Sequence, residues 1–511
     1  MRGPWWRGGV LYQIYVRSFA DSNGDGVGDL AGIRSKLDYL RWLGVDGIWL
    51  SPVTVSPDDD FGYDVSDYCG VQPVLGDLSE LDRLVAEAGE RGIQVLLDIV
   101  PNHSSDRHPW FVEARSSRES PRRGWYVWAE PKPDGSLPNN WVSAFGGPAW
   151  TLDEASGQYY LHHFLPSQPD LDWWNEGVRD AFDDVLRFWF DRGVAGFRID
   201  VAHGLVKDRE LRDNPPDDPW ANNMNRPEVH DVYRRWRRIA DAYDPPRIFL
   251  GETWVLDSEK LGAYYGKGDD ELHMAFNFPF VLAPLETESL RPIVEQTEAA
   301  IPGEGWPVWT LSNHDVVRFP TRWAEGDERK VRAALLMLLT LRGTPVLYYG
   351  DELGMPETEL SDEERLDPAG LTNPPGRDGA RTPMHWTGEP GAGFTEPGVR
   401  PWLPFGRHGD VNVARQRDDR GSVLSFVRDA LALRREEPDL WGGSYAPVDT
   451  EGGLWAWRRG DRTVVAVNFS DDPAALDGVE GRIRLATARE REGDEVSGRL
   501  ELGPWEGVVV V

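Results

Sequence analysis

Apolar runs of strand length recur along the chain and alternate with segments of helical spacing. Eight such runs, rich in β-branched and aromatic residues, have the composition of buried strands. They cover 9–16, 47–50, 93–100, 194–200, 247–252, 273–278, 307–313 and 345–351. In 78–91, 176–192 and 228–243, apolar residues return every three or four positions, which predicts amphipathic helices. Eight strands buried on both faces and alternating with helices predict an α/β fold, a closed (β/α)₈ TIM barrel.

Two stretches interrupt this alternation and predict the domain organisation. The first part of the barrel covers 1–103, and residues 104–175, rich in Pro, Ser, Trp and Gly, predict an inserted subdomain after strand 3. The barrel resumes over 176–440, with a second Pro- and Gly-rich stretch from about 355 to 420. Short alternating strands in 441–511 predict a C-terminal antiparallel β-sandwich domain.

Charge and cysteine content restrict the classes of partner. A formal net charge of −31 over 511 residues, with no basic block, argues against nucleic acid or an anionic membrane as partner. A single cysteine, Cys69, cannot form an internal disulfide, and the N-terminal residues do not have the pattern of a signal peptide. The apolar run at 333–341 is too short to span a bilayer. We therefore expect a cytoplasmic monomer or homodimer that acts on a small molecule.

Polar residues end four of the predicted strands. The segments are DIVPNH (98–103), GFRID (196–200), GE (251–252) and SNHD (312–315). In a parallel barrel the carboxyl ends of the strands meet on one face, where catalytic residues gather. One such residue could be a helix cap. Four of them at the same end of their strands predict a catalytic site.

The residue types suit the cleavage of an acetal with retention of configuration. That reaction needs a carboxylate nucleophile and a carboxylic acid about 5 to 5.5 Å apart. Asp200 and Glu252, on neighbouring strands, meet this need. Arg198 precedes Asp200 by two residues, so it lies on the same strand face and should keep Asp200 ionised. Glu252 follows an apolar strand, where desolvation should favour its protonated form.

These motifs make the sequence similar to the α-amylase family of glycoside hydrolases (family 13), in its exo-acting α-glucosidase and oligo-1,6-glucosidase branch. The resemblance covers essentially the whole chain. It is carried by GYDVSDY (62–68), DIVPNH (98–103), QPDLDWWN (168–175), GFRID (196–200), GETW (251–254) and SNHD (312–315).

The resemblance implies roles for three carboxylates. Asp200 resembles the nucleophile, Glu252 the general acid/base, and Asp315 the carboxylate that holds the sugar hydroxyls. Arg198 resembles the companion of the nucleophile, and Val201 lies directly after Asp200. The resemblance therefore implies hydrolysis through a covalent β-glucosyl-enzyme intermediate.

The resemblance also implies a closed pocket for one terminal glucose. His103 and His314 resemble hydrogen-bond partners of that unit. Asp64 resembles the residue that holds the non-reducing end, and Tyr63 the ring that stacks beneath the sugar. An arginine in GRDGARTPMHW (376–386) is expected to pair with Asp64, and we favour Arg381 over Arg377.

A metal site is expected in DSNGDGVGD (21–29). Asp21, Asn23, Asp25, the Val27 carbonyl and Asp29 stand at alternate positions, as at the start of an EF-hand loop. The set suits a structural Ca²⁺, or Mg²⁺ with more of its water, and the branch that the chain resembles carries an ion here. The alternative is an Asx-turn loop without metal. No His or Cys cluster has zinc spacing, and no organic cofactor is expected.

Three residues leave the substrate linkage open. Asp172 and His385 replace residues that are frequently Asn and Gln in relatives, and we expect both near the acceptor side. Val201 accompanies 1,6 linkages in oligo-1,6-glucosidases, whereas GFRIDVAHGLVKD resembles 1,4-active enzymes. We expect an α-glucosidase releasing glucose from short 1,4-linked oligosaccharides such as maltose. The alternatives are an oligo-1,6-glucosidase, a transglucosylase, a trehalose- or sucrose-cleaving relative, and an inactive homologue serving as a transporter subunit.

Overall fold

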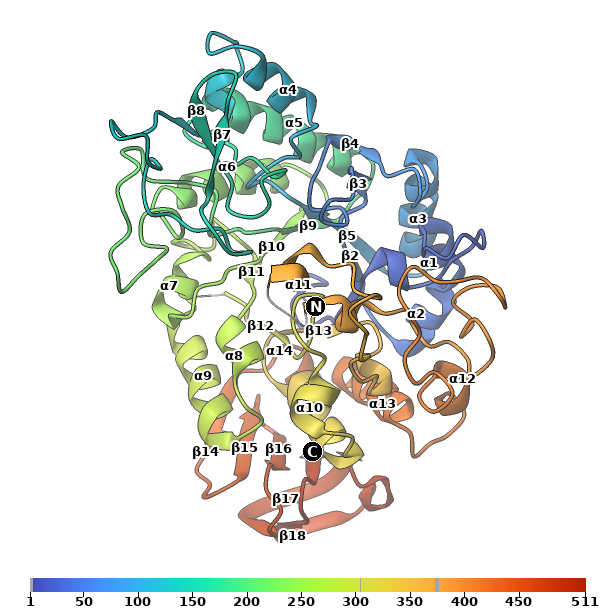
Figure 1. The fold of residues 1–511 in the computed structure, drawn as a ribbon. Coiled ribbons are helices and arrows are strands. Elements are labelled where there is room, and N and C mark those ends of the chain that lie inside the picture. Colours follow the sequence, from blue (N-terminus) through green and yellow to red (C-terminus); the bar gives the residue numbers. More distant parts are fainter. Residues whose placement is uncertain (1–2, 304, 373–375) are drawn as a thin grey trace.

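Eight parallel strands form a nearly closed barrel at the centre of the molecule (Figure 1). The computed structural model describes residues 3–303, 305–372 and 376–511. Each predicted strand run overlaps one barrel strand, which confirms the eight-strand prediction. The strands are β1 (Leu11–Ile14), β2 (Gly47–Leu50), β5 (Gln94–Ile99), β9 (Gly196–Ile199), β10 (Ile248–Gly251), β11 (Met274–Ala275), β12 (Val308–Thr310) and β13 (Thr344–Tyr348). They pair in the order β11-β10-β9-β5-β2-β1-β13-β12, and a parallel bridge from Phe276 to Val308 joins the two ends.

Helices cover the outside of the barrel. The three predicted helices form as α3 (Leu78–Glu90), α5 (Glu176–Asp191) and α6 (Val229–Ala240). Side chains cap two of them, because Asp77 accepts from Glu80 N and Asn175 accepts from Gly177 N. The remaining helices are α1 (Leu30–Ser35), α2 (Leu37–Leu43), α4 (Pro109–Ser116), α7 (Ser258–Ala263), α8 (Phe278–Leu282), α9 (Thr287–Ala300), α10 (Glu328–Thr340), α11 (Pro368–Thr372), α12 (Val413–Gln416), α13 (Val423–Glu436) and α14 (Pro438–Gly442). Among the described residues, no helix has both the length and the apolarity needed to cross a bilayer.

The barrel interior changes from apolar to charged along its strands. Leu11, Trp49, Leu96 and Ile248 belong to one buried cluster inside the barrel. Side chains on a strand alternate between its two faces, so the residue two positions after Leu96, Asp98, also points inward. Asp98 is aligned with Arg198 on β9. The packed apolar residues earlier in the strands therefore support a charged layer at the carboxyl ends of the strands.

Two smaller sheets flank the barrel. After β5, a subdomain contains α4 and a three-stranded sheet of β6 (Trp128–Ala129), β8 (Gln158–Leu161) and β7 (Trp150–Asp153), shown at the top of Figure 1. After β2, the short antiparallel pair β3 (Thr54–Val55) and β4 (Asp67–Val71) flanks a loop that contributes to the site described below. The subdomain and this loop stand over the barrel face where the strands end.

The C-terminal domain, at the bottom of Figure 1, is antiparallel as predicted. Its strands are β14 (Tyr445–Val448), β15 (Leu454–Arg459), β16 (Thr463–Asn468), β17 (Ala474–Ala486), β18 (Glu495–Leu502) and β19 (Gly507–Val510). They form one connected sheet in the order β14-β15-β16-β19-β17-β18. The long strand β17 joins its two parts, because its first residues pair with β18 and its last with β19.

Candidate active site

One buried arginine holds three carboxylates together at the ends of neighbouring strands. Arg198 Nη1 lies 2.9 Å from Asp98 Oδ1 and 2.8 Å from Asp200 Oδ1, and its Nη2 lies 2.7 Å from Glu252 Oε2. Strand register places them there, because Ile199 is aligned with Ile99 on β5 and with Gly251 on β10. The structure thus brings the predicted residues Arg198, Asp200 and Glu252 into one cluster.

A glycine allows the close approach of β9 and β10 that this cluster requires. A Cβ added at Gly196 would lie 2.3 Å from Ile248 O, closer than Cβ atoms come to other atoms in proteins. A larger residue would push the two strands apart. Asp200 and Glu252 would then separate as well, because each follows directly on its strand.

Because these carboxyl groups are buried together, the pKa of each depends on its neighbours. Desolvation raises the pKa of Asp98 to about 7 and the pKa of Asp200 well above its usual value, although Arg198 lowers both. Glu252 and Asp98 raise the pKa of Asp200 further. Arg198 lowers the pKa of Asp200, the direction that we predicted from the sequence, and burial and the neighbouring carboxylates raise it.

The residue directly after Asp200 has a strained backbone. Val201 has φ of 45°, a left-handed conformation that β-branched residues rarely adopt. Its N–H donates to Glu252 Oε2 at 2.9 Å, and its side chain lines the cavity beside the cluster. Strain of this kind persists only where the surroundings enforce it, and it is concentrated at functional sites.

Asp315 follows β12 and lies beside two arginines and a histidine. Its Oδ1 lies 3.0 Å from Arg381 Nη2 and 3.2 Å from Arg377 Nη1, and its Oδ2 lies 3.2 Å from His314 Nε2. Burial tends to raise the pKa of Asp315, but Arg377 and Arg381 hold it below its usual range. Asp315 is therefore ionised, with its carboxylate on the cavity wall.

A chain of hydrogen bonds fixes His314 and Tyr63. Gln13 Nε2 lies 2.8 Å from His314 Nδ1, so Nδ1 accepts and the proton is on Nε2, 2.6 Å from Tyr63 Oη. Tyr63 donates in turn to Asp98 Oδ2 at 3.2 Å, and its ring stacks on that of His314. Burial lowers the pKa of His314 well below its ordinary value, so this imidazole is neutral.

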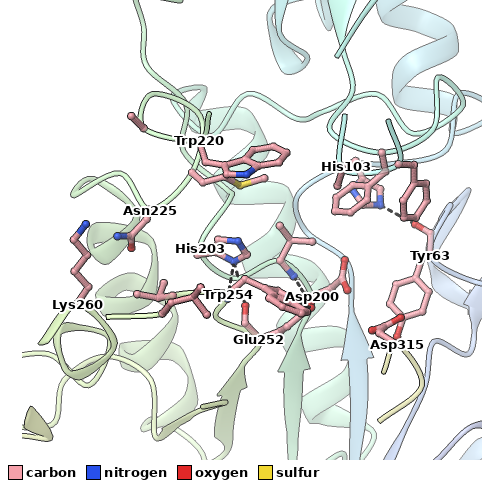
Figure 2. Close-up of a pocket in the computed structure, with 18 of the residues that line it drawn as sticks. Tyr63, His103, Asp200, His203, Trp220, Asn225, Glu252, Trp254, Lys260 and Asp315 are labelled. Atoms are coloured by element: carbon pink, nitrogen blue, oxygen red, sulfur yellow. Dashed lines mark hydrogen bonds between the residues drawn. The ribbon is translucent and has the colours of Figure 1, made fainter. Parts of the chain in front are cut away.

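His103 is held on the same side of the cavity. Its Nε2 donates to Tyr63 O at 2.9 Å. Burial lowers its pKa to about 4, so it is neutral at physiological pH. Figure 2 shows Tyr63, His103 and Asp315 on one side of the pocket and Asn225 and Lys260 on the other, with Asp200 and Glu252 between them.

The predicted pairing of Arg381 with Asp64 is wrong. Asp64 is buried behind the pocket, where its carboxylate accepts from Ser56 Oγ at 2.6 Å and from the N–H groups of Asp59 and Asp60. The acid that lines the cavity is Asp60, and it pairs with Arg377 at 2.9 Å. Asp64 instead shapes the turn that presents Asp60, a role that the spacing of the two acids does not reveal.

Arg377 closes one end of the cavity. It contacts Asp60, Asp315 and, at 2.7 Å, Asp367. It therefore connects the loop after β2 to the residue after β12, and its guanidinium lies over the Phe145 ring of the subdomain. Arg381 lies behind it and braces the end of β12 by donating to His314 O at 2.8 Å.

The active site has a cavity of about 950 Å³ and includes residues that sequence reasoning missed. Asp98 opens the DIVPNH motif at a strand end, so its position could have identified it. His203 and Trp254 line the cavity beside Glu252, and Trp254 Nε1 donates to Glu252 Oε1 at 2.9 Å. Trp254 directly follows the GE motif, but nothing in the sequence shows that its indole folds back onto the acid.

The two residues expected near the acceptor side lie elsewhere. Neither Asp172 nor His385 is among the described residues that line this cavity. Asp172 borders a separate cavity of about 580 Å³, lined in part by the subdomain, and accepts from Trp174 N at 3.0 Å. His385 is buried with its Nδ1 2.9 Å from Val411 O.

The predicted metal loop forms a series of Asx turns. Asp21 Oδ1 accepts from Gly24 N at 2.8 Å and Oδ2 from Gly26 N at 2.8 Å, and Asp25 Oδ1 accepts from Val27 N. Asp29 caps α1 by accepting from Gly32 N at 2.7 Å. No three His, Cys, Asp or Glu side chains gather into a metal-binding group anywhere in the described ranges.

Comparison with known proteins identifies the same enzyme family that the fold and the site indicate. Residues 13–443 match the α-amylase catalytic domain family, and residues 440–509 match a domain of unknown function, DUF3459. The chain belongs to the α-amylase family (glycoside hydrolase family 13) and is a glycoside hydrolase with α-glucosidase relatives.

The similar proteins have several named activities. A probable α-glucosidase of Rhizobium meliloti (strain 1021) is 44% identical, covering 92% of this chain and 90% of its own. An oligo-1,6-glucosidase of Heyndrickxia coagulans is 37% identical, covering 93% of each chain. The solved structure of XgtA, described as an α-glucosyl transfer enzyme, is 43% identical with a TM-score of 0.93 and full coverage of both chains. The trehalulose synthase MutB is 34% identical with a TM-score of 0.94, covering 99% of this chain and 100% of its own.

Proposed function

We propose that the protein is a retaining exo-α-glucosidase that releases terminal α-D-glucose from short 1,4-linked oligosaccharides such as maltose. The observation that carries this proposal is the contact of one guanidinium with both Asp200 and Glu252. Carboxyl groups bound to the two terminal nitrogens of one guanidinium must lie close together, which favours the short spacing of a retaining pair over the wider spacing of an inverting pair.

Asp200 attacks the anomeric carbon and forms the glucosyl-enzyme, while Glu252 protonates the departing oxygen. Glu252 then takes the proton of the water that hydrolyses the intermediate. The Val201 N–H and the Trp254 indole hold the two oxygens of Glu252 in place. Asp315, ionised beside Arg377 and Arg381, accepts hydrogen bonds from the sugar hydroxyls, and Tyr63 supports the ring.

The exo mode is supported by the closed end of the cavity. Asp60, Arg377 and Asp315 form a connected wall of ion pairs beyond Tyr63. A chain cannot continue through this wall, so one glucose unit at the non-reducing end fits. Asp60 and Arg377 replace the predicted pair Asp64 and Arg381 in this role.

Replacement of the nucleophile tests the proposal. Asp200→Ala should lower kcat/KM for an aryl α-glucoside by at least about 10⁴-fold. Proton NMR of the first product formed by the unmodified enzyme should show α-glucose. Unimpaired hydrolysis by Asp200→Ala would exclude Asp200 as nucleophile, and β-glucose as first product would exclude retention. Comparison of kcat/KM for maltose, isomaltose, trehalose and sucrose decides the linkage, which Val201 leaves open.

We also propose that loop 21–29 binds Ca²⁺. Gly26, the sixth residue of the loop, has φ of 88° and donates to Asp21, as the glycine of an EF-hand loop does. The donor types suit a hard cation: carboxylates of Asp21, Asp25 and Asp29, the Asn23 amide oxygen and the Val27 carbonyl. To bind the ion, the carboxylates would turn from the backbone N–H groups that they now accept from. The ion would brace the first βα connection and take no part in bond cleavage. Thermal unfolding with and without a chelator tests it, and an unchanged Tm would contradict it.

A further inference from the structure

The separate cavity of about 580 Å³ is lined both by the inserted subdomain and by the loop between β9 and α6. Arg123 and Trp128 line it from the subdomain, and Lys207 and Arg209 line it from the loop. Its volume lies within the range of small-molecule sites. None of the described residues that line it also lines the active-site cavity, so a ligand here would not compete with the substrate for space.

Two arginines of this cavity have no carboxylate partner. Neither Arg123 nor Arg209 forms an ion pair with a described residue. Arg123 is 8% exposed and donates to a backbone carbonyl and to the side chains of Ser156 and Gln158, all of which are neutral. The guanidinium of Arg209 lies over the ring of Trp174, 4.4 Å from its centroid. An unpaired charge in a buried position is costly, so an anion in the cavity would stabilise it.

The remaining charges of the cavity leave an excess of positive charge. Arg118, Lys207 and Asp208 also line it, and each is neutralised by an ion pair of 2.9, 2.8 and 2.6 Å, respectively. Among the described lining residues, the two unpaired arginines therefore outnumber one unpaired carboxylate, that of Asp172. This excess occurs in a chain whose formal net charge is −31.

The tryptophan rings of the cavity are already covered by arginines. The guanidinium carbon of Arg123 lies 3.3 Å from the centroid of the Trp128 ring, which also stacks on Phe111 with the two rings 1° from parallel. Arg209 covers Trp174 in the same way. A guanidinium held on an aromatic ring keeps its N–H groups in a fixed plane, which suits bidentate recognition of phosphate or carboxylate. The cavity therefore suits an anion better than the stacking of a neutral sugar ring.

We propose that this second cavity binds a phosphate group, as inorganic phosphate or as a sugar phosphate ester, and that its occupancy acts on the active site. Two unpaired arginines match a phosphate group, with a charge of about −1.5 to −2 near pH 7, better than a carboxylate with its single charge. The Asp172 carboxylate would accept hydrogen bonds from the hydroxyl groups of an attached sugar.

The loop between β9 and α6 connects the two cavities. Lys207 lines the second cavity, and Trp220, further along the same loop, lines the active-site cavity. Lys207 Nζ also donates to Asn102 Oδ1 at 2.7 Å, and Asn102 Nδ2 lies 3.2 Å from His103 Nδ1 in the wall of the active site. A phosphate group bound beside Lys207 would therefore hold the loop that borders the substrate.

Isothermal titration calorimetry tests the binding, with the active site filled by 1-deoxynojirimycin so that sugars bind elsewhere. Inorganic phosphate and glucose 6-phosphate should bind, and glucose should not. Tighter binding of glucose 6-phosphate than of phosphate would support the site with a sugar ester as its ligand, and equal binding would support it with phosphate itself. Absence of binding by both anions, or equally tight binding of glucose, would overturn the proposal.

A substitution at Arg209 locates the bound anion. Arg209→Gln should weaken binding of the tighter anion at least about tenfold, because hydrogen bonds to a charged group are lost. Arg209 is exposed, so the fold should persist. Arg458→Gln is the matched control, since Arg458 is exposed on β15 in the C-terminal domain and forms no ion pair with a described residue. Equal affinity in the two variants would overturn the site.

Steady-state kinetics with an aryl α-glucoside tests the action on the active site. The tighter anion, at saturation, should change KM by about fivefold or more in the unmodified enzyme. At the same concentration it should change KM less in Arg209→Gln. An unaltered KM in the unmodified enzyme would overturn the action on the active site. The calorimetric comparison of Arg209→Gln with Arg458→Gln needs no turnover, so failure of the proposed exo-α-glucosidase function would leave its result intact.

Discussion

Buried arginines serve two opposite purposes in this protein. At the active site, Arg198 contacts the carboxylates of Asp98, Asp200 and Glu252. At the end of α10, Arg434 and Arg459 contact backbone carbonyls, and neither forms an ion pair with a described residue. Burial would lower the pKa of Arg198, but the carboxylates raise it well above its usual value. Burial lowers the pKa of Arg434 to about 10, since no such partner compensates.

Arg459 connects the C-terminal domain to the barrel, and Arg434 acts within the barrel. Arg434 on α13 donates to Leu339 O at 2.8 Å and Leu341 O at 3.2 Å. Arg459 on β15 donates to Thr340 O at 2.6 Å and Leu440 O at 3.0 Å. The last carbonyls of a helix have no partners within it, so these guanidinium groups satisfy them. The charge of Arg198 therefore serves catalysis. Arg434 and Arg459 instead stabilise the fold through hydrogen bonds from their N–H groups.

Removal of Arg198 should have the largest effect. Arg198→Met leaves three buried carboxylates without a counter-charge, so kcat/KM for an aryl α-glucoside should fall by about 10²- to 10⁴-fold, corresponding to about 3 to 5 kcal/mol. Steady-state kinetics measures it, and circular dichroism verifies the fold. Activity within tenfold of the unmodified enzyme would show that the cluster does not depend on the shared arginine.

The same substitution at Arg434 should act on stability instead. Arg434→Met removes the donors to the end of α10, and the free energy of unfolding should fall by about 2 to 4 kcal/mol. At 25 °C, kcat/KM should stay within twofold. Denaturant unfolding and kinetics on the same preparation provide both values. A large loss of kcat/KM in folded protein would remove the distinction between the two regions.

A substitution at Asp98 tests whether the carboxylates around Arg198 influence one another. Asp98 raises the pKa of Asp200, so Asp98→Asn should lower it. The nucleophile must be ionised, so the acidic limb of the pH profile of kcat/KM should move to lower pH. We also expect a loss of about 10- to 100-fold in kcat/KM at the optimum, because Arg198 loses one of its partners. An acidic limb that stays in place would mean that Asp98 does not influence the nucleophile.

The sequence predicts the barrel well because strand hydrophobicity is a local property. Each of the eight predicted runs overlaps a strand, and Arg198, Asp200, Glu252 and Asp315 gather as predicted because strand register is regular. Loop residues were predicted less well. Asp60 and Asp64 both lie in the loop after β2, and only the folded turn shows that Asp60 faces Arg377. The left-handed conformation of Val201 could not be predicted either, because its amino-acid type disfavours it.

The most direct test of the central claim is capture of the glucosyl-enzyme on Asp200. Glu252→Gln should still react with α-glucosyl fluoride, because fluoride departs without an acid, and the intermediate should accumulate because no base activates water. Mass spectrometry should then show the added mass of one glucosyl unit on the peptide that contains Asp200. Glucosylation of a different residue, or turnover of α-glucosyl fluoride to β-glucose without any adduct, would contradict the account.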